Sequence, residues 1–150
     1  IGLSFGLHAS AAQPLVNTYG TGGNFFSDPP RTDTAIKGYD TVAYFKENKP
    51  VKGSDQFTTT WKGAKWKFAN KENLEAFTKG PEKFAPQYGG YCAYGVSQGY
   101  LVKIEPDQFK ILDGKLYLNY DEDVSKKWGK DTAGYIKAAD KMFPEALGRR

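Results

Sequence analysis

The sequence predicts a small single α+β domain, in which antiparallel β-hairpins pack with a short central helix and a C-terminal helix. Three patterns indicate this class: aromatic and polar side chains alternate over residues 57–68, an Asp113-Gly114 pair separates two apolar runs, and a helical apolar stripe follows Asp121. A chain of 150 residues suits one domain with one core. Aromatic residues form 15% of the chain, and their large areas compensate for a hydrophobic fraction of only 39%.

The first two expected elements are a strand and a hairpin. The short apolar run over residues 42–45 predicts a strand. After it, alternation places Phe57, Trp61, Trp66 and Phe68 on one face, with threonines and lysines on the other. A Lys-Gly pair between the two runs supplies the turn, so we expect a β-hairpin with one aromatic face and one hydrated face.

The middle of the chain predicts a helix, a helical turn and another strand. Asn70 is a suitable N-cap for a helix over residues 71–79, and the Gly-Pro pair that follows should end it. Residues 82–87 are expected to add a helical turn. Residues 100–102 form an apolar run that predicts a strand.

A second hairpin is predicted near the C-terminal end. Asp113-Gly114 joins the runs 109–112 and 116–120, and Asp-Gly is the pair that a tight type I′ turn prefers.

The last section of the chain is expected to be helical. Asp121 is a good N-cap, and Pro144 is expected to end the helix. Gly129 and Gly134 predict a break into two pieces. The buried stripe would consist of Val124, Trp128, Tyr135, Ile136, Ala139 and Phe143.

The N-terminal residues predict an exported protein. Residues 1–7 are apolar and uncharged, and Ala9-Ser10-Ala11 resembles a cleavage site, so residues 1–12 are interpreted as a signal-peptide remnant rather than an ordinary terminus rich in small residues. The expected location is periplasmic or secreted. Residues 13–34 are rich in Asn, Thr, Gly, Ser and Pro and predict a flexible N-terminal arm, which leaves the folded domain at 35–147. No other stretch is apolar for long enough to form a transmembrane segment.

The charge pattern argues against nucleic-acid binding. The net charge is +4 and the isoelectric point about 9.0, but the lysines are scattered, as on a solvated surface. Nucleic-acid recognition favours a basic stripe with arginines, and this chain has only Arg31, Arg149 and Arg150.

Residues 88–97 are the predicted ligand-binding segment. They hold the only cysteine, three tyrosines and three glycines that allow close backbone approach. Tyr88, Tyr91, Cys92 and Tyr94 are therefore the candidate site residues, as the wall of a small-molecule pocket. Tyrosine is amphipathic, so the same pattern also suits packed core.

The residue types exclude several kinds of chemistry. The only histidine, His8, lies in the predicted signal remnant, so a Cys–His nucleophile and a tetrahedral Cys/His zinc site both lack their imidazole. Residues 121–123 are acidic but lack the spacing of a calcium loop, and no Lys-Ser/Thr follows the glycines as in a phosphate loop. Cys92 is left as a candidate ligand for a soft metal such as copper, within one chain or across a dimer, or as a small buried apolar residue.

Several motifs resemble YHS-domain proteins. In that family the opening commonly reads G-Y-D-P-V-A-Y-F, and here Gly38 to Phe45 read G-Y-D-T-V-A-Y-F. The similar segments occur in the family's order over about residues 35–144, and the last two look like an exported bacterial branch. They are 35–45, 61–68, 72–73, 77, 81–84, 85–93 and 114–120.

The resemblance implies an α+β scaffold and, for the branch linked to metal-transport ATPases, metal binding. That branch carries one cysteine in the opening motif and two at a strand-to-helix corner. Here Ala43 stands at the first position, and the corner reads Phe68-Ala69-Asn70, so those metal ligands do not transfer.

The expected function is therefore that of a non-catalytic exported YHS-domain binding protein for a soft metal such as copper or a small ligand. The alternative is a structural or assembly protein that docks another exported protein, or a second copy of itself, through its N-terminal arm and aromatic surface. An enzyme with redox chemistry at Tyr and Cys is the third hypothesis.

Overall fold

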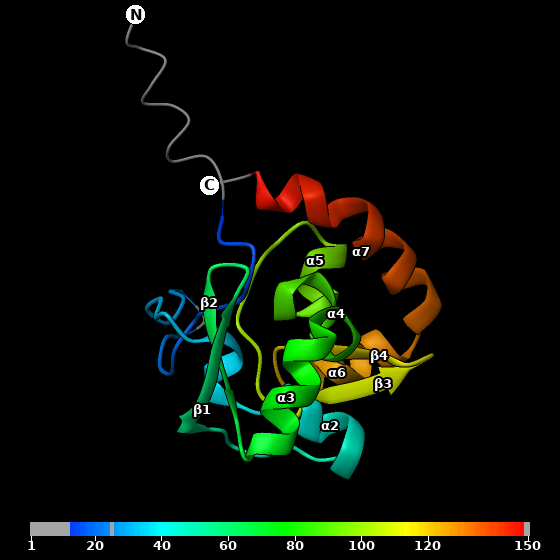
Figure 1. Ribbon diagram of the computed structural model, residues 1–150. Coiled ribbons are helices and arrows are strands. Elements are labelled where there is room, and N and C mark those ends of the chain that lie inside the picture. Colours follow the sequence, from blue (N-terminus) through cyan, green and yellow to red (C-terminus); the bar gives the residue numbers. More distant parts are fainter. Residues whose placement is uncertain (1–12, 25, 149–150) are drawn as a thin grey trace, which may run out of the picture.

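A computed structural model describes residues 13–24 and 26–148, and the predicted signal remnant lies outside these residues (Figure 1). The hairpin of β1 (Ser54–Trp61) and β2 (Ala64–Phe68) forms one side of the molecule, and the long helix α7 (Thr132–Leu147) forms the opposite side. Shorter elements fill the space between them. The described residues form six α-helices and two antiparallel two-stranded sheets, which confirms the predicted α+β class.

The first hairpin follows the predicted alternation. Thr59 pairs with Trp66 and Trp61 with Ala64, so the aromatic side chains share one face. Trp66 and Phe68 are almost fully buried, whereas the alternating residues Lys65 and Lys67 remain partly exposed.

Helix α3 (Lys71–Lys79) packs beside this hairpin and has the predicted bounds. The side chain of Asn70 accepts a hydrogen bond from the N–H of Asn73 at 2.8 Å, which caps the helix. The predicted helical turn is present as two shorter elements, α4 (Pro81–Phe84) and the 3₁₀ turn η2 (Gln87–Gly90).

The second hairpin is also confirmed. Strands β3 (Phe109–Leu112) and β4 (Lys115–Leu118) pair across Asp113 and Gly114, whose φ angles of 53° and 74° are those of a type I′ turn. Leu116 and Leu118 point into the core and are fully buried.

Two predicted strands are wrong. Residues 42–45 lie in helix α2 (Thr41–Glu47), because Asp40 caps its N-terminus by accepting a hydrogen bond from the N–H of Ala43 at 3.1 Å. A four-residue apolar run alone does not distinguish a buried strand from a buried helix. Residues 100–102 follow helix α5 (Ala93–Ser97) as irregular chain, and Val102 accepts one backbone bond, from Cys92, rather than joining a ladder.

The C-terminal section forms two helices, as the glycines predicted. Helix α6 (Glu122–Gly129) is capped by Asp121, and α7 is capped by Asp131. Pro144 does not end α7, contrary to the prediction. The helix continues to Leu147, whose carbonyl accepts a hydrogen bond from Gln13 at 2.7 Å, and Ala146 is buried beneath that last turn. With 16 residues, α7 is the longest described helix, and none in residues 13–24 and 26–148 is long and apolar enough to cross a membrane.

Part of the segment expected to be a flexible arm, residues 16–19, packs on the domain, whereas residues 21–24 and 26–28 are exposed. Val16, Asn17, Thr18 and Tyr19 are buried, and Ile36 of the 3₁₀ turn η1 (Ala35–Gly38) donates to the Asn17 carbonyl at 3.1 Å. Composition suggested a linker, but one buried amide with several backbone partners holds these residues in place.

Asp40 joins three elements and is predicted to be a major source of stability. Its fully buried carboxylate accepts from Ala43 N in α2, and from Ala69 N and Asn73 Nδ2, both at 2.8 Å. Asp40→Ala leaves these donors unpaired and is expected to lower the free energy of unfolding by roughly 3 kcal/mol or more.

The matched control for this prediction is Asp55→Ala. Asp55 is exposed and pairs with Lys67 at 2.6 Å, so its loss should lower the stability much less than the loss of Asp40 in urea denaturation. Equal losses in the two variants would show that Asp40 does not have this role.

Candidate functional site

The predicted tyrosine–cysteine cluster is mostly packed core. Tyr91 is fully buried and its hydroxyl donates to the carbonyl of Pro14 at 2.7 Å. Tyr88 is 8% exposed and donates to Asp140 Oδ1 at 2.8 Å. Burial raises the pKa of both phenols, and the carboxylate of Asp140 raises the pKa of Tyr88 further, so both hydroxyls stay protonated.

Cys92 has a structural position in this cluster. It is 1% exposed, and its Sγ caps helix α5 by accepting from the N–H of Gly95 at 3.3 Å. The thiol faces Asn119 Oδ1 at 3.5 Å, and that oxygen also accepts from the N–H of Tyr94. Burial raises the pKa of Cys92 to about 11, so the thiol is protonated at neutral pH and is a poor nucleophile or metal ligand.

The geometry gives Cys92 no set of partner ligands for a metal. Within the described ranges, no group of three or more His, Cys, Asp or Glu side chains lies close enough to hold an ion. The half-buried Tyr94 packs edge-on against Tyr135, with ring centroids 5.0 Å apart. Of the four predicted site residues, only Tyr88 lines the cleft between the first hairpin and α7 that is described below. The four residues therefore do not surround one cavity.

The glycines of this segment allow the N-terminal residues to approach. Gly89 has a φ of +63°, and a Cβ there would collide with the carbonyl oxygen of Leu15. Its own carbonyl accepts from the N–H of Asn17 at 2.8 Å. At Gly89 the predicted close approach is therefore one of backbone to backbone, whereas Gly90 lies against the side chain of Ile36.

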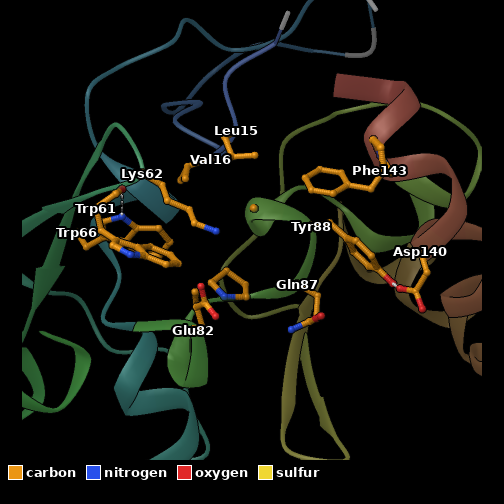
Figure 2. A pocket seen from close by; sticks show the side chains of 14 residues that line it. Leu15, Val16, Trp61, Lys62, Trp66, Glu82, Gln87, Tyr88, Asp140 and Phe143 are labelled. Atoms are coloured by element: carbon orange, nitrogen blue, oxygen red, sulfur yellow. Dashed lines mark hydrogen bonds between the residues drawn. The ribbon is translucent and has the colours of Figure 1, made fainter. Parts of the chain in front are cut away.

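A cleft lies beside the cluster, between the first hairpin and α7. Its volume is about 480 Å³, within the range of small-molecule sites. Figure 2 shows Trp61 and Trp66 on one side and Tyr88 and Phe143 on the other, with Leu15 beside the opening between them. Leu15 is 43% exposed, so an apolar side chain at this cleft is available to a ligand.

The aromatic walls are rigidly supported. Trp66 Nε1 donates to the carbonyl of Trp61 at 2.9 Å, and both indoles pack against Phe77, at 5.1 Å from the Trp66 ring and 5.6 Å from the Trp61 ring. On the opposite wall the Tyr88 ring contacts Phe143, with centroids 5.8 Å apart. Both surfaces therefore have little conformational freedom to lose on binding.

A few polar groups border these walls. The ammonium of Lys62 lies 4.7 Å from the centroid of the Trp61 ring, a cation–π arrangement. Glu82, Gln87 and Asp140 also line the cleft (Figure 2). An apolar cleft with a small number of polar groups is the usual form of a small-molecule site.

Sequence reasoning identified these residues but not their juxtaposition. Trp61 and Trp66 were assigned to a hairpin face, and Phe143 to a helical stripe. One local feature indicates the site: the aromatic face of the hairpin extends to its turn, where the partly exposed Trp61 precedes Lys62. No short-range pattern relates that turn to a helix eighty residues later.

Cys92 yields a prediction about stability and pH. Its pKa rises from 9.0 to about 11 on folding, so the unfolded state loses the proton first. The stabilisation is complete below pH 9 and is lost as the pH rises towards 11. The unfolding free energy of wild type minus that of Cys92→Ala should therefore fall by on the order of 2 kcal/mol across this interval.

The measurement is chemical denaturation of both proteins at several pH values, since other titrating groups cancel in the difference. A thiol reagent should react slowly with the native protein at neutral pH. A difference that is constant with pH, together with fast modification, would contradict the buried and protonated thiol.

Comparison with protein-family models, curated proteins and solved structures finds no match to this chain. The resemblance to YHS-domain proteins therefore stays a prediction from the residues. The structure describes what those residues form: 35–45 make η1 and most of α2, 61–68 the turn of the first hairpin and β2, and 85–93 the tyrosine loop.

Proposed function

We propose that this protein is a non-catalytic binding protein that holds a small, partly aromatic ligand in the cleft between the first hairpin and α7. One observation carries the proposal: rings from β1, β2, η2 and α7 line a single cavity of about 480 Å³. We retain the exported YHS-type scaffold as part of the proposal, on the sequence motifs alone.

Binding is favoured over catalysis by the chemistry of the lining. Neither cysteine nor histidine is among the residues that line the cleft. The hydroxyl of Tyr88 is already hydrogen-bonded to Asp140, and its raised pKa keeps the proton on the phenol. The residues present supply apolar contact, stacking and a few orienting charges, which are the elements of recognition.

The copper version of the function is less favoured by the geometry. Cys92 is enclosed and holds its proton, so a copper ion would have to open the core around α5 to reach it. The assembly version is also less favoured, because Val16–Tyr19 of the expected docking arm are buried against their own domain.

A neutral fluorescent probe, N-phenyl-1-naphthylamine, tests the cleft. We expect saturable binding of one probe per chain, with enhanced probe fluorescence. Trp61→Leu and Phe143→Leu each keep apolar volume but remove a ring from opposite walls, and each should weaken binding by about tenfold.

The matched control is Tyr100→Leu, which removes a 63% exposed ring that lines no part of the cleft. It should bind the probe like wild type. If both wall variants bind normally while circular dichroism shows them folded, or if only Tyr100→Leu loses binding, the cleft is not the site.

A further inference from the structure

A second cavity adjoins the aromatic cleft and has a different charge. Its volume is about 320 Å³, and Leu15, Val16 and Lys62 line both cavities. Arg31, Thr18 and Thr32 also line this second cavity. Two of its lining residues are cations, and none is an aspartate or glutamate.

Arg31 is held rigidly at this cavity by aromatic rings. Its Cζ lies 3.8 Å from the centroid of the Tyr19 ring and 5.3 Å from that of Tyr91. These cation–π contacts restrain the position of the guanidinium.

Among the described residues, no acceptor meets the hydrogen-bond geometry for the outer nitrogens of this guanidinium. Both of these nitrogens, Nη1 and Nη2, are buried. In the part of the chain that the structure describes, Arg31 takes part in none of the ion pairs. The nearby Asp28 accepts from the Tyr19 hydroxyl at 3.2 Å instead. Arg31 as a whole is half-buried, but two buried N–H groups without an acceptor are costly, which points to a partner that binds from outside.

We propose that this cavity is an oxyanion subsite, in which the carboxylate or phosphate of a ligand pairs with Arg31. Lys62, at the turn between β1 and β2, contributes the second positive charge. This proposal rests on the function proposed above. The apolar part of the same ligand would lie between the rings of the adjoining cleft. The class of ligand is thus an aromatic or apolar molecule that carries one carboxylate or phosphate group.

The geometry of the guanidinium supports an oxyanion in particular. Its planar pair of N–H donors matches the two oxygens of a carboxylate or phosphate, whereas a halide offers only one acceptor. Lys62 is a flexible point charge, so it contributes attraction rather than geometric selection.

Two matched probes test the anion: 2-naphthoate, and 2-naphthalenemethanol, which has the same ring system without the charge. We expect 2-naphthoate to bind the wild type about tenfold or more tightly, as hydrogen bonds to charged groups allow. The preference should shrink with added salt. In Arg31→Met the preference should fall to the small part that Lys62 supplies, and Arg31→Lys should keep an intermediate preference, because it retains the charge but lacks the fork.

The control variant is Lys46→Met, which removes an exposed cation of α2 that lines neither cavity. It should keep the full preference for 2-naphthoate. Equal binding of the two probes to wild type, or an unchanged preference in Arg31→Met, would overturn the subsite.

A measurement on the wild type guards against loss of folding in Arg31→Met. Inorganic phosphate is titrated while the side-chain N–H signals of Arg31 are followed by NMR, and saturable shifts of these signals are expected. Signals that do not move would overturn the subsite, even if the neutral naphthyl probe still binds the cleft. If phosphate shifts Arg31 while Trp61→Leu has no effect on 2-naphthoate, the subsite stands and the proposed cleft function fails.

Discussion

The structure depends on the hydrogen bonds that one buried residue, Asn17, makes through its backbone and its side-chain amide. Its N–H donates to Gly89 at 2.8 Å and its Nδ2 to Gly90 at 3.0 Å, while its own oxygens accept from Tyr19 N and Ile36 N. These bonds tie the N-terminal segment to the tyrosine loop and to η1. Because Asn17 is 2% exposed, losing them would leave several polar groups buried without partners.

The same segment separates the tyrosine–cysteine cluster from the two cavities that we propose as the ligand site. Pro14 accepts a hydrogen bond from the Tyr91 hydroxyl, and Tyr19 packs edge-on against the Tyr91 ring, with Arg31 close to both rings, so residues of the N-terminal segment fill the tyrosine–cysteine cluster. Leu15 and Val16 then line both cavities at the margin of the cluster. The residue types suggested a pocket within the tyrosine–cysteine cluster. In the structure the cavities lie next to the cluster and are lined by Leu15 and Val16.

The parts of the fold that were predictable have local causes. Asp113-Gly114 selects its turn within two residues, and the caps Asn70 and Asp121 act on N–H groups three residues away. The site depends on long-range packing: Trp61 and Phe143 line the same cleft because the hairpin and α7 pack on two separate clusters of buried side chains that border it. The packing of residues 16–19 was not predicted because two partners of Asn17, Gly89 and Gly90, lie some seventy residues away.

The central claim is that the segment around Asn17 is an integral part of the domain. Hydrogen exchange of backbone amides, measured by NMR on the full chain, tests it most directly. The amides of Asn17 and Thr32, bonded to Gly89 and Thr18, should exchange as slowly as the core amides of Tyr91 and Cys92. Exchange of Asn17 and Thr32 at the rate of an unstructured peptide, with Tyr91 still protected, would contradict the account.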